Sequence, residues 1–353
     1  MTKGTVAIGG PAHPLSQTLP ARPTLEEVAK VAGVSRATVS RVINGSPRVS
    51  ADVLEVVGAA IAELNYVPNR AARSLVARAT MSIALVVPED AHRFFGDPYF
   101  ADVVQGISNR LSDSDYVLNL QLTHPNSPSE KTRRYLLGGN VDGALVVSHH
   151  SGDHFLASLG RSLPVVFGGR PLGDLAHPGD YYIDVDNQRG ARQGTQHLVD
   201  LGRRAIATIT GPPDMPASVD REAGWRETVL SAGLDDFRLA RGDFTEAGGI
   251  RAALQLVDEH PDLDAIFVAS DLMASGVMLA LAERGLRVPT DVAIVGFDNS
   301  RYATRGRVGL TTVAQPAQEM GHVMADTLLR LLAGETAPRV TMMETHLIIR
   351  ESA

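Results

Sequence analysis

Residues 24–44 read TLEEVAKVAGVSRATVSRVIN and predict two short helices joined by a tight turn. Thr24 and Glu27 have the spacing of a capping box, in which each side chain accepts a hydrogen bond from the backbone of the other. Gly33 supplies the left-handed backbone that a sharp inter-helix turn requires. Ser35 is placed to cap the second helix, which is expected to end near Gly45. The stretch therefore predicts a helix-turn-helix.

The two helices are expected to bury one apolar side each. The apolar positions are Val28, Ala29, Val31 and Ala32, followed by Val39, Val42 and Ile43. The outward side of the second helix then carries Arg36, Ala37, Thr38, Ser40 and Arg41. An exposed helix with arginines near its start, held across a first helix, can enter the major groove of DNA. A helical hairpin inside a larger bundle is the alternative interpretation.

A third helix and a short basic segment follow. Ser50 is expected to cap the third helix, whose apolar residues are Val53, Val56, Val57, Ile61 and Leu64. Residues 65–80 read NYVPNRAARSLVARAT, in which Pro68 interrupts the chain and Asn69 can cap a new helix. Basic residues surround Leu75 in this segment. An isolated helix of about eight residues is marginal in water, so the segment is expected to order only against a partner.

The run 23–80, through GVSRATVSRVING, ELNYVPN and ARSL, resembles the DNA-binding headpiece and hinge helix of the lactose/galactose repressor family of bacterial transcription regulators. The resemblance places residues 36–41 on a recognition helix, where Arg41 would read guanine through O6 and N7. It makes Leu75 a wedge for the minor groove. Phosphate contacts are implied for Ser35, Ser50, Asn69 and Arg73. For Ser35 and Ser50, capping alone is an equally good interpretation.

Charge is distributed unevenly along the 353 residues, whose formal net charge is −7. Residues 1–78 carry nine Lys and Arg against five Asp and Glu, whereas the rest carry twenty-four against thirty-five. DNA contact is therefore expected in the first part only. The chain has no cysteine, which excludes disulfides, zinc-thiolate sites and thiol nucleophiles. We find no secretion signal and no run of membrane-spanning length, so a cytoplasmic protein with no membrane contact is expected.

From residue 81 onward, short apolar runs alternate with helical patterns, which predicts parallel sheets covered by helices. The strand-like runs are residues 81–87, 116–122, 143–148, 164–169, 205–211, 265–270 and 292–298. Their two series indicate two lobes, with a ligand in the cleft beyond the carboxyl ends of the strands. The predicted fold class is an all-α helix-turn-helix headpiece with a hinge helix, followed by a two-lobed α/β core.

Enzyme motifs are missing from this second part. No G-x-G-x-x-G follows a strand, no Gly-Lys pair exists for a phosphate-binding loop, and G-x-S-x-G is absent. His149, His150 and His154 have the types and spacing of metal ligands, but the end of a strand and the start of a helix explain them better. We therefore expect no catalysis, no cofactor and no metal.

The resemblance extends to the effector-binding core of the same family through the stretches IALVVP, DGALVVS, DVDN, REAGW and VPTDVAIVGFDN. That core is itself similar to periplasmic sugar-binding proteins. The whole resemblance covers residues 23–350. It implies a tail at 1–22, a helix-turn-helix domain at 23–67, a hinge at 68–80 and an effector-binding and dimerisation domain at 81–353.

The resemblance also implies effector contacts. Arg221 matches an arginine that grips paired hydroxyls or a carboxylate, and Asp298 an acid that accepts hydrogen bonds from the ligand. Phe244 would stack on a sugar or a base, or would belong to the core. The expected neighbours are Phe95, Asp97, Tyr99, His149, Asp186, Asp271 and Gln315. Of these, Asp186 and Asp271 could instead be helix caps.

Two departures from the family pattern bear on the ligand, namely Ser270, where many members carry asparagine, and a longer, more aromatic loop at 90–100. The resemblance favours a carbohydrate, with a purine or another metabolite as the alternative. It implies a homodimer on a near-palindromic operator, because no leucine heptad follows LIIRESA. The function expected is a ligand-responsive repressor of sugar uptake or catabolism. The sequence leaves open whether ligand binding weakens or strengthens operator binding. The alternative class is a sugar carrier without gene regulation.

Overall fold

The computed structural model describes residues 23–43, 46, 48–66, 79–123 and 130–353. The chain forms two compact units, residues 1–78 and residues 79–353. Asn69, Arg73 and Leu75, which the sequence assigns to DNA contact, lie outside the described residues.

The first unit contains α1 (Leu25–Val31), α2 (Arg36–Ile43) and α3 (Ala51–Glu63). The predicted capping box is confirmed: Thr24 N donates to Glu27 Oε2 at 2.7 Å, and Glu27 N donates to Thr24 Oγ1 at 3.3 Å. Gly33 has the expected left-handed backbone, with φ of 65°. Ser35 Oγ accepts from Thr38 N at 3.1 Å, as a cap should. Local hydrogen bonds therefore set the boundaries of these helices.

The core of this unit is narrower than the apolar pattern predicts. Val28, Val39 and Val57 are fully buried, but Val31 and Val56 are 45% and 48% exposed. Helices this short contact one another along one narrow strip. Val56 is rotated by about 100° around α3 from the buried Val57, so its side chain points away from that strip. Ser50 occupies the N-cap position of α3 as predicted, but its side chain makes no capping hydrogen bond.

The second unit has two lobes, each built on a six-stranded sheet. In the first lobe the strand order is β11-β5-β4-β3-β1-β2 and every neighbouring pair is parallel. These strands are β1 (Ser82–Val87), β2 (Val117–Leu122), β3 (Gly143–Val147), β4 (Val165–Gly168), β5 (Tyr181–Val185) and β11 (Val340–Met343). Helices cover both faces of the central strands. Side chains on both faces are therefore buried, which explains the continuous apolar sequence of strands such as β3.

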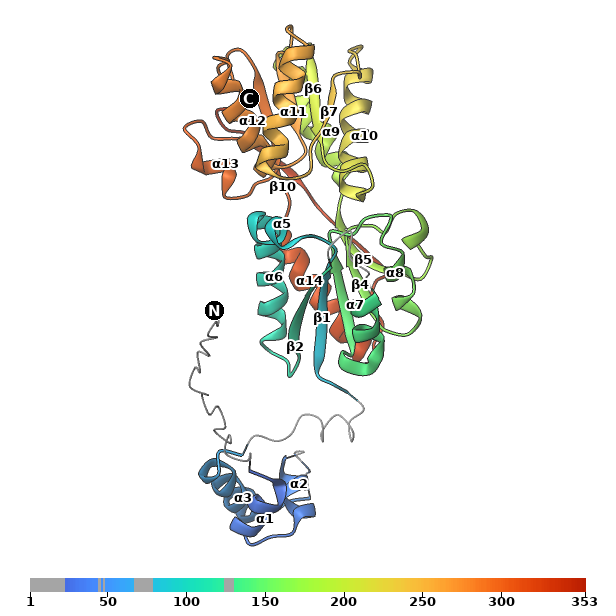
Figure 1. The fold of residues 1–353 in the computed structure, drawn as a ribbon, viewed down its shortest axis with the longest axis vertical. Coiled ribbons are helices and arrows are strands. Elements are labelled where there is room, and N and C mark those ends of the chain that lie inside the picture. The colour runs from blue at the N-terminus through green and yellow to red at the C-terminus, as the bar shows by residue number, and fades with distance from the viewer. Residues whose placement is uncertain (1–22, 44–45, 47, 67–78, 124–129) are drawn as a thin grey trace, which may run out of the picture. The chain divides into compact units, whose positions relative to one another are not determined.

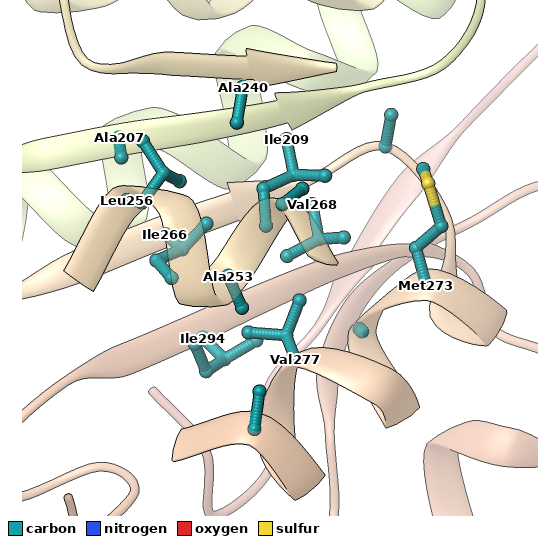
Figure 2. Packing of buried hydrophobic residues seen from close by; sticks show 14 of the residues in the cluster. Ala207, Ile209, Ala240, Ala253, Leu256, Ile266, Val268, Met273, Val277 and Ile294 are labelled. Atoms are coloured by element: carbon teal, nitrogen blue, oxygen red, sulfur yellow. The ribbon is translucent and has the colours of Figure 1, made fainter. Parts of the chain in front are cut away.

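The second lobe repeats this order as β12-β10-β9-β8-β6-β7, and only the β10–β12 pair is antiparallel. Its strands are β6 (Ile206–Thr210), β7 (Leu239–Arg241), β8 (Ala265–Val268), β9 (Ala293–Asp298), β10 (Thr311–Ala314) and β12 (His346–Ile348). Figure 2 shows the core under one face of this sheet, where Ala253 and Val277 of the covering helices meet Ile266 and Ile294 of the strands.

The first lobe carries α5 (Ala91–Gly96), α6 (Pro98–Leu111), α7 (Glu130–Tyr135), α8 (His154–Ala157) and α14 (Ala317–Leu332). The second carries α9 (Asn187–Asp200), α10 (Pro216–Ser231), α11 (Glu246–Glu259), α12 (Asp271–Glu283) and α13 (Tyr302–Arg305). The late helix α14, red in Figure 1, lies beside α6 in the first lobe. The predicted helix-turn-helix headpiece and two-lobed α/β core are thus confirmed, whereas residues 68–78 of the predicted hinge lie outside the described residues.

The chain passes between the lobes three times, after β5, after β10 and after β11. The first sheet is therefore completed by β11 from the C-terminal part of the sequence, and the second by β12, which follows β11 directly. The three connections can act as a hinge. In the described ranges, no helix is both long and apolar enough to span a lipid bilayer.

Candidate functional site

A cavity of about 670 Å³, which includes space open to solvent, lies between the two lobes near the carboxyl ends of their strands. This is where doubly wound sheets place their ligands, and the volume suits a small molecule. Of the effector contacts expected from sequence, seven line it: Asp97, Tyr99, His149, Arg221, Phe244, Asp298 and Gln315.

Backbone strain is concentrated at this cavity. Ser148, Phe244 and Asp298 line it and have positive φ values of 58°, 60° and 115°. Each lies at or shortly after the carboxyl end of a strand. Residues other than glycine avoid this region of backbone space, and such residues cluster where the chain must aim a side chain at a ligand.

Arg221 is fixed at the base of the cavity by groups from several elements. Its Nε donates to Asn187 Oδ1 at 2.9 Å, and its Nη1 donates to the carbonyl oxygen of Ala269 at 2.6 Å. The guanidinium lies 3.6 Å from the ring centroid of Phe297. Asp298 Oδ1 is 3.7 Å from Nη1. No hydrogen bond reaches Nη2 within the described part of the chain, so this group can donate to a ligand.

Two carboxyl groups face the cavity from opposite lobes. Asp97 accepts from the backbone N–H of Tyr99 at 3.0 Å, and Asp298 accepts from Gln315 Nε2 at 2.6 Å. Burial raises the pKa of both carboxyls, although Arg221 opposes the shift at each. Among the described residues, hydrogen bonds reach only Oδ1 of each carboxyl, so the second oxygen can pair with a ligand hydroxyl.

His149 presents a neutral ring whose tautomer is fixed. Its Nε2 lies 3.3 Å from the carbonyl oxygen of Arg170, which can only accept, so Nε2 carries the hydrogen. Burial lowers the pKa of His149 to about 4, and the ring is therefore uncharged near neutral pH. Its Nδ1 is buried without a partner among the described residues. This nitrogen is consequently an acceptor available to a ligand hydroxyl.

The motif DVDN contributes residues other than the one we expected. Asp186 caps α9 by accepting from Arg189 N at 2.9 Å and does not line the cavity. Asp184 and Asn187 line it instead, because Asp184 still belongs to β5 and Asn187 begins α9. Burial raises the pKa of Asp184 to about 6, and its carboxylate accepts from Asn187 Nδ2 at 3.0 Å. The sequence signal that could have identified Asp184 is its position at the carboxyl end of the predicted strand, where ligand-binding residues lie in such sheets.

Phe95 and Asp271 also lie away from the cavity. Phe95 is 73% exposed, because α5 turns its neighbour Phe94 into the core. Asp271 is fully buried, and it accepts from Thr312 Oγ1 at 2.5 Å and from Ser300 N at 2.6 Å. It therefore braces β10 and the loop after β9. Burial raises the pKa of Asp271 to about 7.

Ion pairs join the lobes beside the cavity. His150 lies between carboxylates of the two lobes, with Nδ1 2.9 Å from Asp214 Oδ2 and Nε2 3.2 Å from Glu89 Oε1. Burial alone would lower the pKa of His150, but these two bonds outweigh it and raise the pKa to about 9. Arg170 Nη2 also reaches Asp220 Oδ1 at 2.8 Å. We call these contacts the inter-lobe pairs; they link the two lobes beside the cavity.

The three histidines considered as metal ligands are thus divided among other roles. His149 and His150 have the partners described above, and His154 begins α8. Within the residues that the structure describes, no group of three or more His, Asp or Glu side chains could hold a metal ion.

In the first unit, α2 presents a polar surface. Arg36, Ala37 and Arg41 are exposed, whereas Thr38 and Ser40 are partly buried. Arg36 Nη1 pairs with Glu26 Oε1 of α1 at 3.0 Å. Arg41 is the exposed cation in the last turn of α2, so its guanidinium projects from the outward side of the helix.

Comparison with known proteins agrees with both halves of this description. Residues 24–69 match the family model described as bacterial regulatory proteins, lacI family, and residues 195–353 match a periplasmic binding protein-like domain. The HTH-type transcriptional regulator CelR of Thermobifida fusca is 46% identical over 335 residues, which cover 94% of this chain and 98% of the relative.

Two solved structures show the same architecture. A transcriptional regulator CelR–cellobiose complex matches with a TM-score of 0.74 and 44% identity, over 94% of this chain and 100% of the other. The lac repressor dimer bound to operator and the anti-inducer ONPF matches with a TM-score of 0.83 and 28% identity, over 94% and 99%. This protein therefore belongs to the lacI family of bacterial regulatory proteins and is a ligand-responsive, DNA-binding transcriptional regulator.

Proposed function

We propose that this protein is a transcriptional repressor that leaves its operator when a neutral oligosaccharide of the cellobiose type binds between the lobes. The observation that carries the proposal is the cavity's set of free polar groups. Asp97, Asp298 and His149 offer acceptors, whereas Arg221 offers a donor. A ligand rich in hydroxyl groups can satisfy both kinds.

The charge of the cavity supports a neutral ligand. Three acids line it, namely Asp97, Asp184 and Asp298, and the two arginines in its lining are already engaged. Arg221 bonds to Asn187 and to a backbone carbonyl, and Arg93 pairs with the Glu89 carboxylate. A phosphate or carboxylate on the ligand would meet like charges in a poorly solvated site. Sugar rings also have apolar faces, which suit an aromatic ring such as that of Phe244.

The choice of a β-linked glucose disaccharide rests on similarity. The protein named CelR is 46% identical to this chain along nearly its whole length, and a related CelR structure contains cellobiose. We therefore propose cellobiose as the first probe. Binding is proposed to occur without turnover, so the sugar should be recovered intact.

For the DNA side, we propose a homodimer on a near-palindromic operator, with two copies of α2 in successive major grooves. Arg41 would read guanine, and residues 36–40 would complete the contact surface. Ser35 and Ser50 lie at the starts of helices and would contact phosphate, as would Asn69 and Arg73; Leu75 would enter the minor groove. The last three lie outside the described residues.

Calorimetric titration with cellobiose, glucose, maltose and hypoxanthine tests the ligand class. We expect cellobiose to bind and to lower operator affinity, measured by fluorescence anisotropy on labelled DNA at fixed salt concentration. Chromatography of the recovered sugar tests the absence of turnover. Binding of hypoxanthine with no response to any sugar would overturn the carbohydrate assignment and leave the DNA-binding assignment intact.

A further inference from the structure

A second, smaller compartment adjoins the main cavity. Its walls are His92, Gly96, Thr245, Glu246, Leu272 and Tyr302, together with Arg93, Asp97 and Phe244. The last three also line the main cavity. The two compartments are therefore separated by shared side chains rather than by backbone layers, and movement of one side chain can join them.

Arg93 is the side chain in this wall that reaches from one lobe to the other. It belongs to α5 of the first lobe, and its Nη1 donates to the Glu89 carboxylate. The same Nη1 lies 3.7 Å from Met215 Sδ, and the guanidinium is 5.1 Å from the ring centroid of Phe244, both in the second lobe. Only 11% of the Arg93 side chain is exposed. Arg93 thus lies where the two compartments meet, a position that we call the passage.

The hydrogen bonding of Arg93 is incomplete. Its Nε is buried with no partner in the described part of the chain. An unpaired buried N–H is unfavourable, and a ligand hydroxyl at the end of the main cavity would satisfy it. The same group can therefore close the passage and bind the last sugar unit that fits.

The second compartment has the chemistry of a sugar subsite. Thr245, Glu246 and His92 supply groups that bond to hydroxyls, and Tyr302 supplies an aromatic ring. Phe244 borders both compartments. A longer chain of sugar units could extend into it if the passage were open.

Resting on the proposed carbohydrate function, we propose that Arg93 sets the length of the oligosaccharide that this protein accepts. With Arg93 in place the ligand is confined to the main cavity. Without its guanidinium the two compartments become one elongated site, which holds additional sugar units.

Calorimetric titration of the full-length protein with cellobiose and cellotetraose tests this role. We expect wild type to prefer cellobiose, and Arg93→Ser to shift the affinity ratio toward cellotetraose by about tenfold. Arg93→Lys retains the charge but loses the planar fork, so it should shift the ratio less. The matched control is Arg110→Ser, which removes an arginine paired with Asp326 outside the cleft and should leave the ratio unchanged.

The possible failures are distinguishable. If wild type binds neither sugar, both the carbohydrate proposal and the length role are wrong. If wild type binds cellobiose and both Arg93 variants keep the wild-type ratio, the length role alone is overturned. Thermal unfolding in parallel identifies a misfolded Arg93→Ser protein, in which case the comparison with Arg93→Lys decides.

Discussion

The two units of this protein present their functional side chains by different physical means. In the helical unit, residues 24–43 form caps, a turn and an outward helix face, all through contacts within a few residues. In the two-lobed unit, Asp97, His149, Arg221 and Gln315 reach one cavity from positions more than 200 residues apart. The comparison shows that a local pattern can determine a recognition surface, whereas a ligand cavity depends on how two sheets are closed upon each other.

Backbone strain accompanies the ligand cavity of the two-lobed unit. Ser148, Phe244 and Asp298 adopt positive φ at the cavity, where Gly169 does so as well. The described part of the helical unit uses Gly33 and Asn65, two residue types that adopt this conformation readily. The helical unit thus meets its backbone requirements by residue choice, whereas the cavity also imposes them on residues that avoid this conformation.

Removing Arg221 should give the largest effect and should separate the two units most clearly. Because its buried guanidinium is held with Nη2 available to the ligand, we expect Arg221→Ala to weaken ligand binding by about 2–5 kcal/mol. Operator affinity without ligand should stay at the wild-type value. Titration calorimetry and DNA anisotropy measure the two quantities. Arg226→Ala, on the same helix but 41% exposed, is the control and should respond normally.

Arg41→Ala tests the proposed DNA-recognition surface of the helical unit. We expect a loss of about 1–3 kcal/mol at the operator position that Arg41 reads and relaxed specificity there, with sugar binding unchanged. Anisotropy titrations over single-base operator variants measure this. Equal weakening on every DNA sequence would mean that Arg41 contacts phosphate rather than a base. Arg48→Ala, an exposed arginine beyond α2, is the control.

The inter-lobe pairs predict that sugar binding by the two-lobed unit depends on pH, a dependence that we do not expect of the helical unit. The pKa of His150 is raised to about 9 in the folded protein, above the ordinary value of 6.5. Its contribution to stability is therefore complete below pH 6.5 and is lost as the pH rises through 9. We expect sugar affinity to fall over the same window, since deprotonation removes one donor between Glu89 and Asp214.

Calorimetry from pH 6 to 10 on wild type and His150→Gln measures this effect. The variant should bind about threefold to tenfold more weakly at neutral pH and should show a flatter profile. A variant profile as steep as that of wild type would assign the pH dependence to another group.

The smallest expected effect lies in the helical unit. Thr24→Ala removes one half of the capping box and should cost about 1 kcal/mol in local stability. Hydrogen exchange of the α1 amides in the full-length protein measures it. Thr24→Ser retains the hydroxyl and should behave as wild type. Faster exchange in the core strands β1 or β9 would show that the two units are less independent than this comparison requires.

The sequence predicted much of the fold because its signals are local. Capping at Thr24, the turn at Gly33 and the buried strands of both lobes follow from hydrogen-bonding and apolar patterns within short windows. The same reasoning failed for Val31 and Val56, whose exposure depends on how widely three short helices touch. Burial in a small unit is a tertiary property even when the helix itself is not.

The candidate site was predicted in part. Arg221, Asp298 and Gln315 lie where the family resemblance placed them. Asp186 and Asp271 do not, because an acid at a helix start can cap the helix, brace a neighbouring strand or face a ligand, and the sequence is the same in each case. Arg93 was missed, since no local pattern reveals that its guanidinium reaches Phe244 and Met215 of the other lobe.

By itself, the sequence determined a helix-turn-helix with an outward polar surface and a β/α alternation in two series, since both depend on chemistry between near neighbours. Only the tertiary structure decided which acids face the cavity, which tautomer His149 adopts and which side chains link the lobes. Those properties depend on distances between residues remote in the chain, and burial at those distances sets their hydrogen bonds and pKa values.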